Sequence, residues 1–170
     1  MSIPNSLLTT GKERKVMQGP TYLEIDKDIL LCGLKVRTNN ASEMSGQGKI
    51  AKLYEEFDAK GLGEMAIQKH LHIYGVYYEY ESDEKGFYSV LAGIGPLTTK
   101  MLDLTCLAIR KGLYLKFSFK GPLPKTVIDG WQKVWHYFKQ PAAPTRAFDT
   151  DYEQYHPEGV DILIGVKGKQ

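Results

Sequence analysis

Apolar and polar residues alternate along most of this chain in short strand-like runs, and two stretches change to helical spacing. Between residues 22 and 36 the alternation predicts two strands, because neighbouring side chains along a strand point to opposite faces. The apolar face of the second strand comprises Leu30, Cys32, Leu34 and Val36. Residues 38–48 are rich in Asn, Ser and Gly, which predicts a loop.

Residues 49–60 are predicted to form the first helix, which Gly61 and Gly63 should end. The apolar residues that recur at helical spacing in it are Ile50, Leu53, Tyr54 and Phe57. A strand over 70–81, a turn at 82–86 and a strand over 87–94 should then form a hairpin.

The same order of elements occurs a second time after a connection at 95–111, in which residues 102–109 look extended. The predicted elements are a strand over 113–120, a break at 121–124, a helix over 126–139, a strand over 146–155, a turn at 156–159 and a strand over 160–166. The apolar stripe of the second helix comprises Val127, Ile128, Trp131, Val134, Trp135 and Phe138.

Strand–helix–strand–strand, used twice, predicts an α+β fold of duplicated β-α-β-β units around one largely antiparallel sheet. We expect both helices on one face and a ligand pocket between the halves. The helix-free face should be partly open, and we place Gly75, Tyr77 and Asp149 there. Residues 1–19 are predicted to be a flexible leader, and residues 20–170 a single domain.

Composition narrows the function classes. With 170 residues, 42% hydrophobic and 25% charged, the chain is typical of one globular domain with an ordinary core. A net charge of +2 without a long basic run argues against a nucleic-acid surface. No apolar run is long enough to cross a bilayer, and the N-terminus lacks the apolar core of a secretory signal. These features predict a cytoplasmic protein.

Cysteine and histidine usage predicts neither a metal site nor a bound cofactor. Cys32 and Cys106 lie in apolar strand-like runs, so we expect two buried free thiols in a reducing compartment. The histidines lack metal-ligand spacing and are expected at the surface or at strand edges; they are His70, His72, His136 and His156. Neither a glycine-rich phosphate loop before a helix nor a Gly-x-Ser-x-Gly elbow occurs.

Several motifs, in order, resemble the DNA gyrase inhibitor-like family of small-molecule-binding domains, also found as the effector-binding half of AraC- and MerR-type transcription activators. The matching segments are Cys32–Asn39, Ile50–Phe57, Ile73–Tyr77, Tyr88–Gly93, Ile109–Tyr114, Trp131–Trp135 and Ala147–Asp149. The resemblance implies a pseudo-twofold duplication with a central pocket, in which some members bind hydrophobic cations through aromatic side chains and one buried acid. About 20 residues precede the module, too few for a helix-turn-helix domain, so direct DNA binding is not expected.

The resemblance also suggests site residues. The family's acid is usually a glutamate in the strand after the second helix, and the matching position is Asp149, which would face a bound cation. The aromatic candidates are Tyr74, Tyr77, Tyr114, Trp131 and Trp135. The residues alone leave other interpretations open. Asp149 is equally explained as a solvated acid in a row with Asp151 and Glu153, and the two tryptophans as helix core.

The leading hypothesis is a stand-alone binding protein for hydrophobic, aromatic, cationic compounds, acting by sequestration or by signalling, as a homodimer or with a protein partner. One alternative is a hydrolase that opens strained rings in genotoxic compounds, which would need a second acid besides Asp149, such as Glu153 or Glu79. Another is an inhibitor protein that acts on gyrase. The hydrolase hypothesis is the weaker one because no clear acid–base pair is present.

Overall fold

The computed structural model describes residues 19–168, so the proposed leader lies almost wholly outside the described residues. The strands form one antiparallel sheet in the order β1-β6-β8-β7-β3-β4-β2-β5. Their bounds are β1 Thr21–Ile25, β2 Ile29–Thr38, β3 His72–Tyr78, β4 Tyr88–Gly95, β5 Thr105–Ile109, β6 Gly112–Lys120, β7 Arg146–His156 and β8 Gly159–Val166. Within residues 19–168, no helix is both long and apolar enough to cross a membrane.

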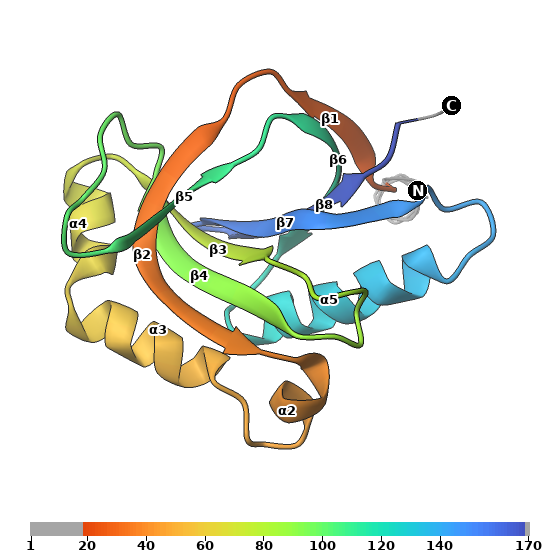
Figure 1. Ribbon diagram of the computed structural model, residues 1–170, viewed down its shortest axis with the longest axis horizontal. Helices are drawn as coiled ribbons and strands as arrows, with labels where there is room; N and C mark the ends of the chain where they lie inside the picture. Colours follow the sequence, from red (N-terminus) through yellow and green to blue (C-terminus); the bar gives the residue numbers. More distant parts are fainter. Residues whose placement is uncertain (1–18, 169–170) are drawn as a thin grey trace, which may run out of the picture.

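The predicted duplication is confirmed by the strand order. One half is β2-α3-β3-β4 and the other is β6-α5-β7-β8, with α3 at Ile50–Ala59 and α5 at Lys125–Phe138. The halves meet where β3 pairs with β7, and β1 and β5 flank them at the two edges. The two long helices lie on the same side of the curled sheet (Figure 1). The α+β fold and the placement of the helices are therefore as expected.

Two short helices were not predicted. Helix α2, Asn40–Met44, lies in the expected loop, and the Asn39 side chain caps it by accepting a hydrogen bond from the Ser42 N–H at 2.8 Å. Helix α4, Leu62–Gln68, follows α3 at once. Gly61 does end α3, but its left-handed backbone (φ +70°) redirects the chain into a new helix, which buries Leu62 and Ala66.

The face without helices is not open, contrary to expectation. Because the sheet curls, the side chains on this face meet one another and form a closed core. Its buried members are Leu31, Tyr74, Val76, Leu91, Ile109, Tyr114, Tyr152 and Leu163. On the other face, α3 packs Leu53 and Phe57 against β4, and α5 packs Val134 against β6 and β8. The apolar positions of both halves are thus buried as two clusters, one under each helix.

Strand β7 carries an irregularity that alternation in the sequence does not reveal. Its register with β8 shifts between Arg146 and Asp151, and Phe148 has a left-handed backbone (φ 51°). The Phe148 ring therefore lies 4.3 Å from the Arg146 guanidinium, on the side of Asp151. In a regular strand Phe148 would share a face with Thr150 and Tyr152, but the bulge reverses the alternation there.

The expectation of two free thiols is also wrong. Cys32 and Cys106 lie directly opposite each other on β2 and β5, with their Cα atoms 4.0 Å apart, and they form a disulfide. The bond ties the edge strand to the body of the sheet. The two cysteines are 74 positions apart in the sequence, so only the pairing of β2 with β5 brings the sulfurs together.

Burial of the α5 stripe makes a prediction about stability. Val134 is fully buried, so Val134→Asp would place an unpaired charge in the cluster under α5 and should lower the free energy of unfolding by about 3–5 kcal/mol. Gln132→Asp, at an exposed position of the same helix, should cost under about 1 kcal/mol. Urea unfolding of both variants measures the difference, and equal losses would contradict the assigned helix face.

Candidate functional site

A large cavity lies on the helix face of the sheet, between α3 of the first half and α5 of the second. Its volume is about 1290 Å³, somewhat above the roughly 300–1,000 Å³ of typical small-molecule sites. Side chains from α2, α3, α4, β3, α5 and β7 line it, so neither half could form it alone. The pocket predicted between the halves is therefore present, but on the face that carries the helices.

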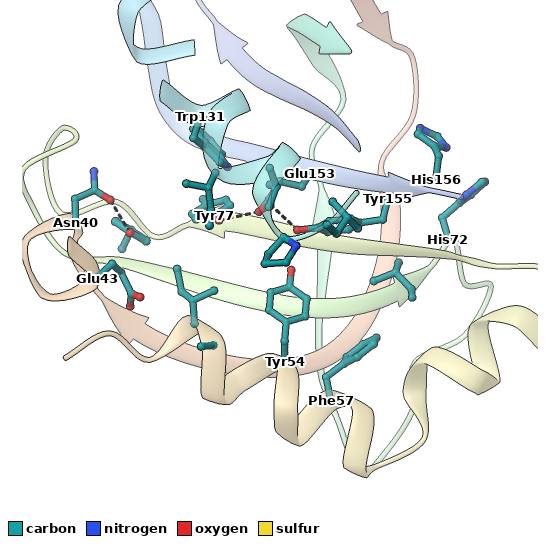
Figure 2. A pocket seen from close by; sticks show the side chains of 18 of the residues that line it. Asn40, Glu43, Tyr54, Phe57, His72, Tyr77, Trp131, Glu153, Tyr155 and His156 are labelled. Carbon is teal, nitrogen blue, oxygen red and sulfur yellow. Dashed lines mark hydrogen bonds between the residues drawn. The ribbon is translucent and has the colours of Figure 1, made fainter. Parts of the chain in front are cut away.

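Glu153 is the polar centre of this cavity. It lies on β7 and only 2% of its surface is exposed. The Tyr77 hydroxyl donates a hydrogen bond to its Oε1 at 2.7 Å, and the Tyr155 hydroxyl donates one to its Oε2 at 2.7 Å. Figure 2 shows the three side chains in a row across the floor of the cavity. Both carboxylate oxygens thus have a neutral partner.

Burial raises the pKa of Glu153 from 4.5 to about 7, because the charged form loses its hydration. The hydroxyls of Tyr77 and Tyr155, and the nearby indole of Trp131, oppose this rise by stabilising the carboxylate. Asp151, the other buried acid of β7, has a cationic partner, because the Arg146 guanidinium lies 2.7 Å from it. Glu153 is therefore a buried acid whose charge is incompletely compensated near neutral pH.

A glycine makes room for this arrangement. Gly75 on β3 pairs across the sheet with Glu153, at the junction of the two halves. A Cβ atom at Gly75 would lie 2.5 Å from the Tyr54 hydroxyl oxygen and 2.9 Å from Glu153 Oε1. The space above the glycine thus holds these two oxygens, and any larger residue would displace them.

Aromatic rings form the walls around the acid. On the α5 side, the rings of Trp131 and Tyr77 are 5.1 Å apart, and those of Trp131 and Trp135 are 6.2 Å apart. On the α3 side, Tyr54 lies edge-on to Tyr155 at 6.3 Å. Rings packed against one another in this way give the cavity a largely apolar wall, and any ring face turned toward a cation would attract it.

The sequence-predicted site residues separate into two groups. Tyr77, Trp131 and Trp135 line the cavity. Tyr74 and Tyr114 lie in the closed core on the opposite face, where both pack against Tyr152.

Asp149 is exposed and is not among the residues that line the cavity. It lies close enough to Tyr114 that its charge, after burial, contributes to a raised pKa of the Tyr114 hydroxyl. The structure therefore does not bring Asp149 together with the aromatic wall, whereas it does so for Glu153, four residues further along β7.

The sequence did not identify Tyr54 and Tyr155 as site residues, and it suggested Glu153 only as a second acid besides Asp149. Residue type was a usable signal, because Glu153 is the one glutamate in β7 and the resembling family uses a glutamate in that strand. Alternation alone could not separate the acids at 149, 151 and 153. The bulge near Phe148 and the position of β3 decide which of them faces the cavity.

The structure is thus a duplicated α+β domain that carries an aromatic cavity around one buried acid, and comparison with known proteins agrees with this fold. Residues 23–166 match the family model of Cass2, the integron-associated effector binding protein, and the chain belongs to this family. YobU of Bacillus subtilis, a proposed transcriptional regulator, is 28% identical over 164 residues, which cover 86% of this chain and 96% of YobU.

Solved structures show the same fold. The integron cassette protein from the mobile metagenome of Vibrio cholerae is 34% identical, with a TM-score of 0.78, over 88% of this chain and 97% of that one. The structure of SAV2435 bound to tetraphenylphosphonium has a TM-score of 0.69 at 20% identity, over 89% of this chain and 95% of that one.

The pKa of Glu153 predicts how stability depends on pH. Its value in the folded state is above its value in the unfolded chain, so folding favours the protonated form. The stability of the wild type should therefore fall as pH rises from about 4.5 to 7, by about 3 kcal/mol at most. Glu153→Gln stays neutral and should be more stable than the wild type at pH 8, with little difference at pH 4.5.

Urea unfolding at the two pH values tests this expectation. Asp149→Asn, which also removes one negative charge from β7 but at an exposed position, is the matched control. A Glu153→Gln variant that is less stable than the wild type at pH 8 would show that the carboxylate is compensated in the free protein.

Proposed function

We propose that this protein binds hydrophobic aromatic cations in the cavity between α3 and α5, and that Glu153 supplies the negative charge. This assigns to Glu153 the part that the sequence motifs suggested for Asp149, and it retains Tyr77, Trp131 and Trp135 as ligand-binding residues. The relation to gyrase inhibitor-like effector-binding domains, suggested by the sequence motifs, is part of the same proposal.

One observation carries the proposal: a buried carboxylate at the centre of an aromatic cavity, bonded to two neutral hydroxyls and to none of the Lys or Arg side chains that form ion pairs within residues 19–168. A buried charge is costly unless it is paired. A cationic ligand would supply the pairing, and the ring faces around it would add cation–π attraction of roughly 0.5–2 kcal/mol each. The complex of SAV2435 with tetraphenylphosphonium, a relative in fold, supports this ligand class.

Binding without hydrolysis of the ligand is favoured because Asp151, the other buried acid near Glu153, is already fully hydrogen-bonded. Ring opening by hydrolysis needs an acid and a base around one water. Asp151, the other buried acid of β7, accepts hydrogen bonds from Arg146, from the Tyr80 hydroxyl at 2.6 Å and from the Gly165 N–H at 2.9 Å. Its oxygens are committed to these donors, and Asp149, the remaining acid of β7, is exposed and does not line the cavity, so β7 supplies no second free carboxylate beside Glu153. Sequestration of a compound, or signalling of its presence to a partner, fits the site better.

A pair of ligands of nearly the same shape and opposite charge tests the proposal. Tetraphenylphosphonium should bind the wild type, whereas tetraphenylborate should not. Glu153→Gln should weaken phosphonium binding by about 1–3 kcal/mol, the scale of a lost charge-assisted contact, and should not weaken borate binding. Isothermal titration calorimetry at pH 8 measures all four combinations. Asp149→Asn is the matched control and should leave both affinities unchanged.

The same pair gives a pH prediction, since neither ligand titrates. Phosphonium affinity should be nearly constant above pH 7 and fall by about tenfold per unit below it, because protonation of Glu153 removes the counter-charge. In Glu153→Gln the affinity should not change over pH 5–8. Equal binding of the two ligands, or a pH dependence that survives in the variant, would show that Glu153 does not provide the charge.

A further inference from the structure

Three buried side-chain polar atoms have no hydrogen-bond partner within residues 19–168, and all three belong to residues that line the same cavity. They are Tyr54 Oη, Trp131 Nε1 and Arg146 Nε. Most buried polar groups in folded proteins are bonded, so each exception requires an explanation. All three atoms carry a hydrogen that can be donated, and none of these hydrogens meets an acceptor at hydrogen-bond geometry within the described residues.

Two of these donors stand next to Glu153. Tyr54 projects from α3 toward the floor of the cavity, where its hydroxyl lies above Gly75 beside Glu153 Oε1 (Figure 2). Trp131 descends from α5 on the opposite side, and its indole N–H is near the carboxylate but without an acceptor at hydrogen-bond geometry. Arg146 is at another part of the site, where its terminal nitrogen is engaged by Asp151.

Neither donor meets an oxygen of Glu153 at hydrogen-bond geometry, and the side-chain hydrogen bonds that Glu153 does accept come from the hydroxyls of Tyr77 and Tyr155. A purely hydrocarbon cation would pair with the acid but would leave the Trp131 N–H and the Tyr54 O–H without a partner, as they are in the free protein. A ligand with an oxygen acceptor close to its cationic centre would satisfy the acid and the donors together.

We propose that Tyr54 and Trp131 form a hydrogen-bond donor subsite, an inference that rests on the cation site proposed above. The preferred ligands are then cations with a carbonyl or other oxygen acceptor one or two bonds from the charged centre. The subsite selects among hydrophobic cations. Glu153 attracts the positive charge of the ligand, and the two donors form hydrogen bonds with the oxygen acceptor beside that charge.

Two ligands that differ in one group test this selection. Benzyldimethylphenacylammonium carries a ketone one carbon from its permanent charge, and benzyldimethyl(2-phenylethyl)ammonium has a methylene in its place. Calorimetry at pH 8 should show that the wild type binds the ketone more tightly, by about 2- to 10-fold for each donor that reaches it. The preference, expressed as a ratio, should disappear in Tyr54→Phe/Trp131→Phe. It should persist in Tyr114→Phe, whose hydroxyl lies in the core and donates to the Arg110 carbonyl at 2.7 Å.

The outcomes separate the two proposals. If both ammonium ions bind equally to the wild type and both are weakened by Glu153→Gln, the cation site stands and the donor subsite is overturned. If neither binds, or if Glu153→Gln changes neither, the cation site fails and the subsite fails with it. A preference that survives in the double variant would also overturn the subsite.

Thermal unfolding without ligand provides a second measurement. Because the Tyr54 hydroxyl has no partner, Tyr54→Phe should leave the melting temperature within about 2 °C of wild type or raise it. Tyr114→Phe removes a bonded hydroxyl and should lower it by about 2–4 °C. A loss in Tyr54→Phe as large as that in Tyr114→Phe would show that the Tyr54 hydroxyl is already satisfied in the free protein, which would overturn the subsite.

Discussion

The pairing of β3 with β7 is the constraint on which the site depends. It joins the two halves in one sheet, and it sets the distance between α3 and α5 that leaves a cavity rather than a helix–helix contact. It also fixes the register that places Glu153 opposite Gly75, so that a side chain on one half extends over a residue without a side chain on the other. A shift of one residue would turn Glu153 into the closed core and Tyr152 into the cavity.

The polar groups in the cavity work against the stability of the free protein. A buried carboxylate near neutral pH and several buried donors without acceptors are features that folding alone would disfavour. The rest of the domain offsets them with clusters of apolar side chains on both faces of the sheet and a disulfide at its edge. A site that is unsatisfied without a ligand gains the most when a ligand of matching charge and hydrogen bonding enters, which is how a rigid scaffold can select a chemical class.

Much of the fold was readable from periodicity, since β-alternation and the helical stripe at Val134 depend on local sequence alone. The errors fall where a distant segment decides the outcome. Cys32 finds Cys106 only when β2 pairs with β5. The helix-free face closes only because the sheet curls, which places Tyr74 and Tyr114 in a core rather than in a pocket. The shift at Phe148 breaks the alternation from which the faces of β7 were predicted.

The sequence by itself thus determined the duplicated α+β units, the apolar stripe of α5, and a pocket between the halves with Trp131, Trp135 and Tyr77 on its wall. Only the tertiary structure decided which acid of β7 is buried, which face of the sheet holds the cavity, and that Tyr54 and Tyr155 join Glu153. The physical reason is that a side chain's burial and pKa depend on everything packed around it. For Glu153 the packed groups include side chains of β3, α3 and α5, which are all separate from β7 in the sequence.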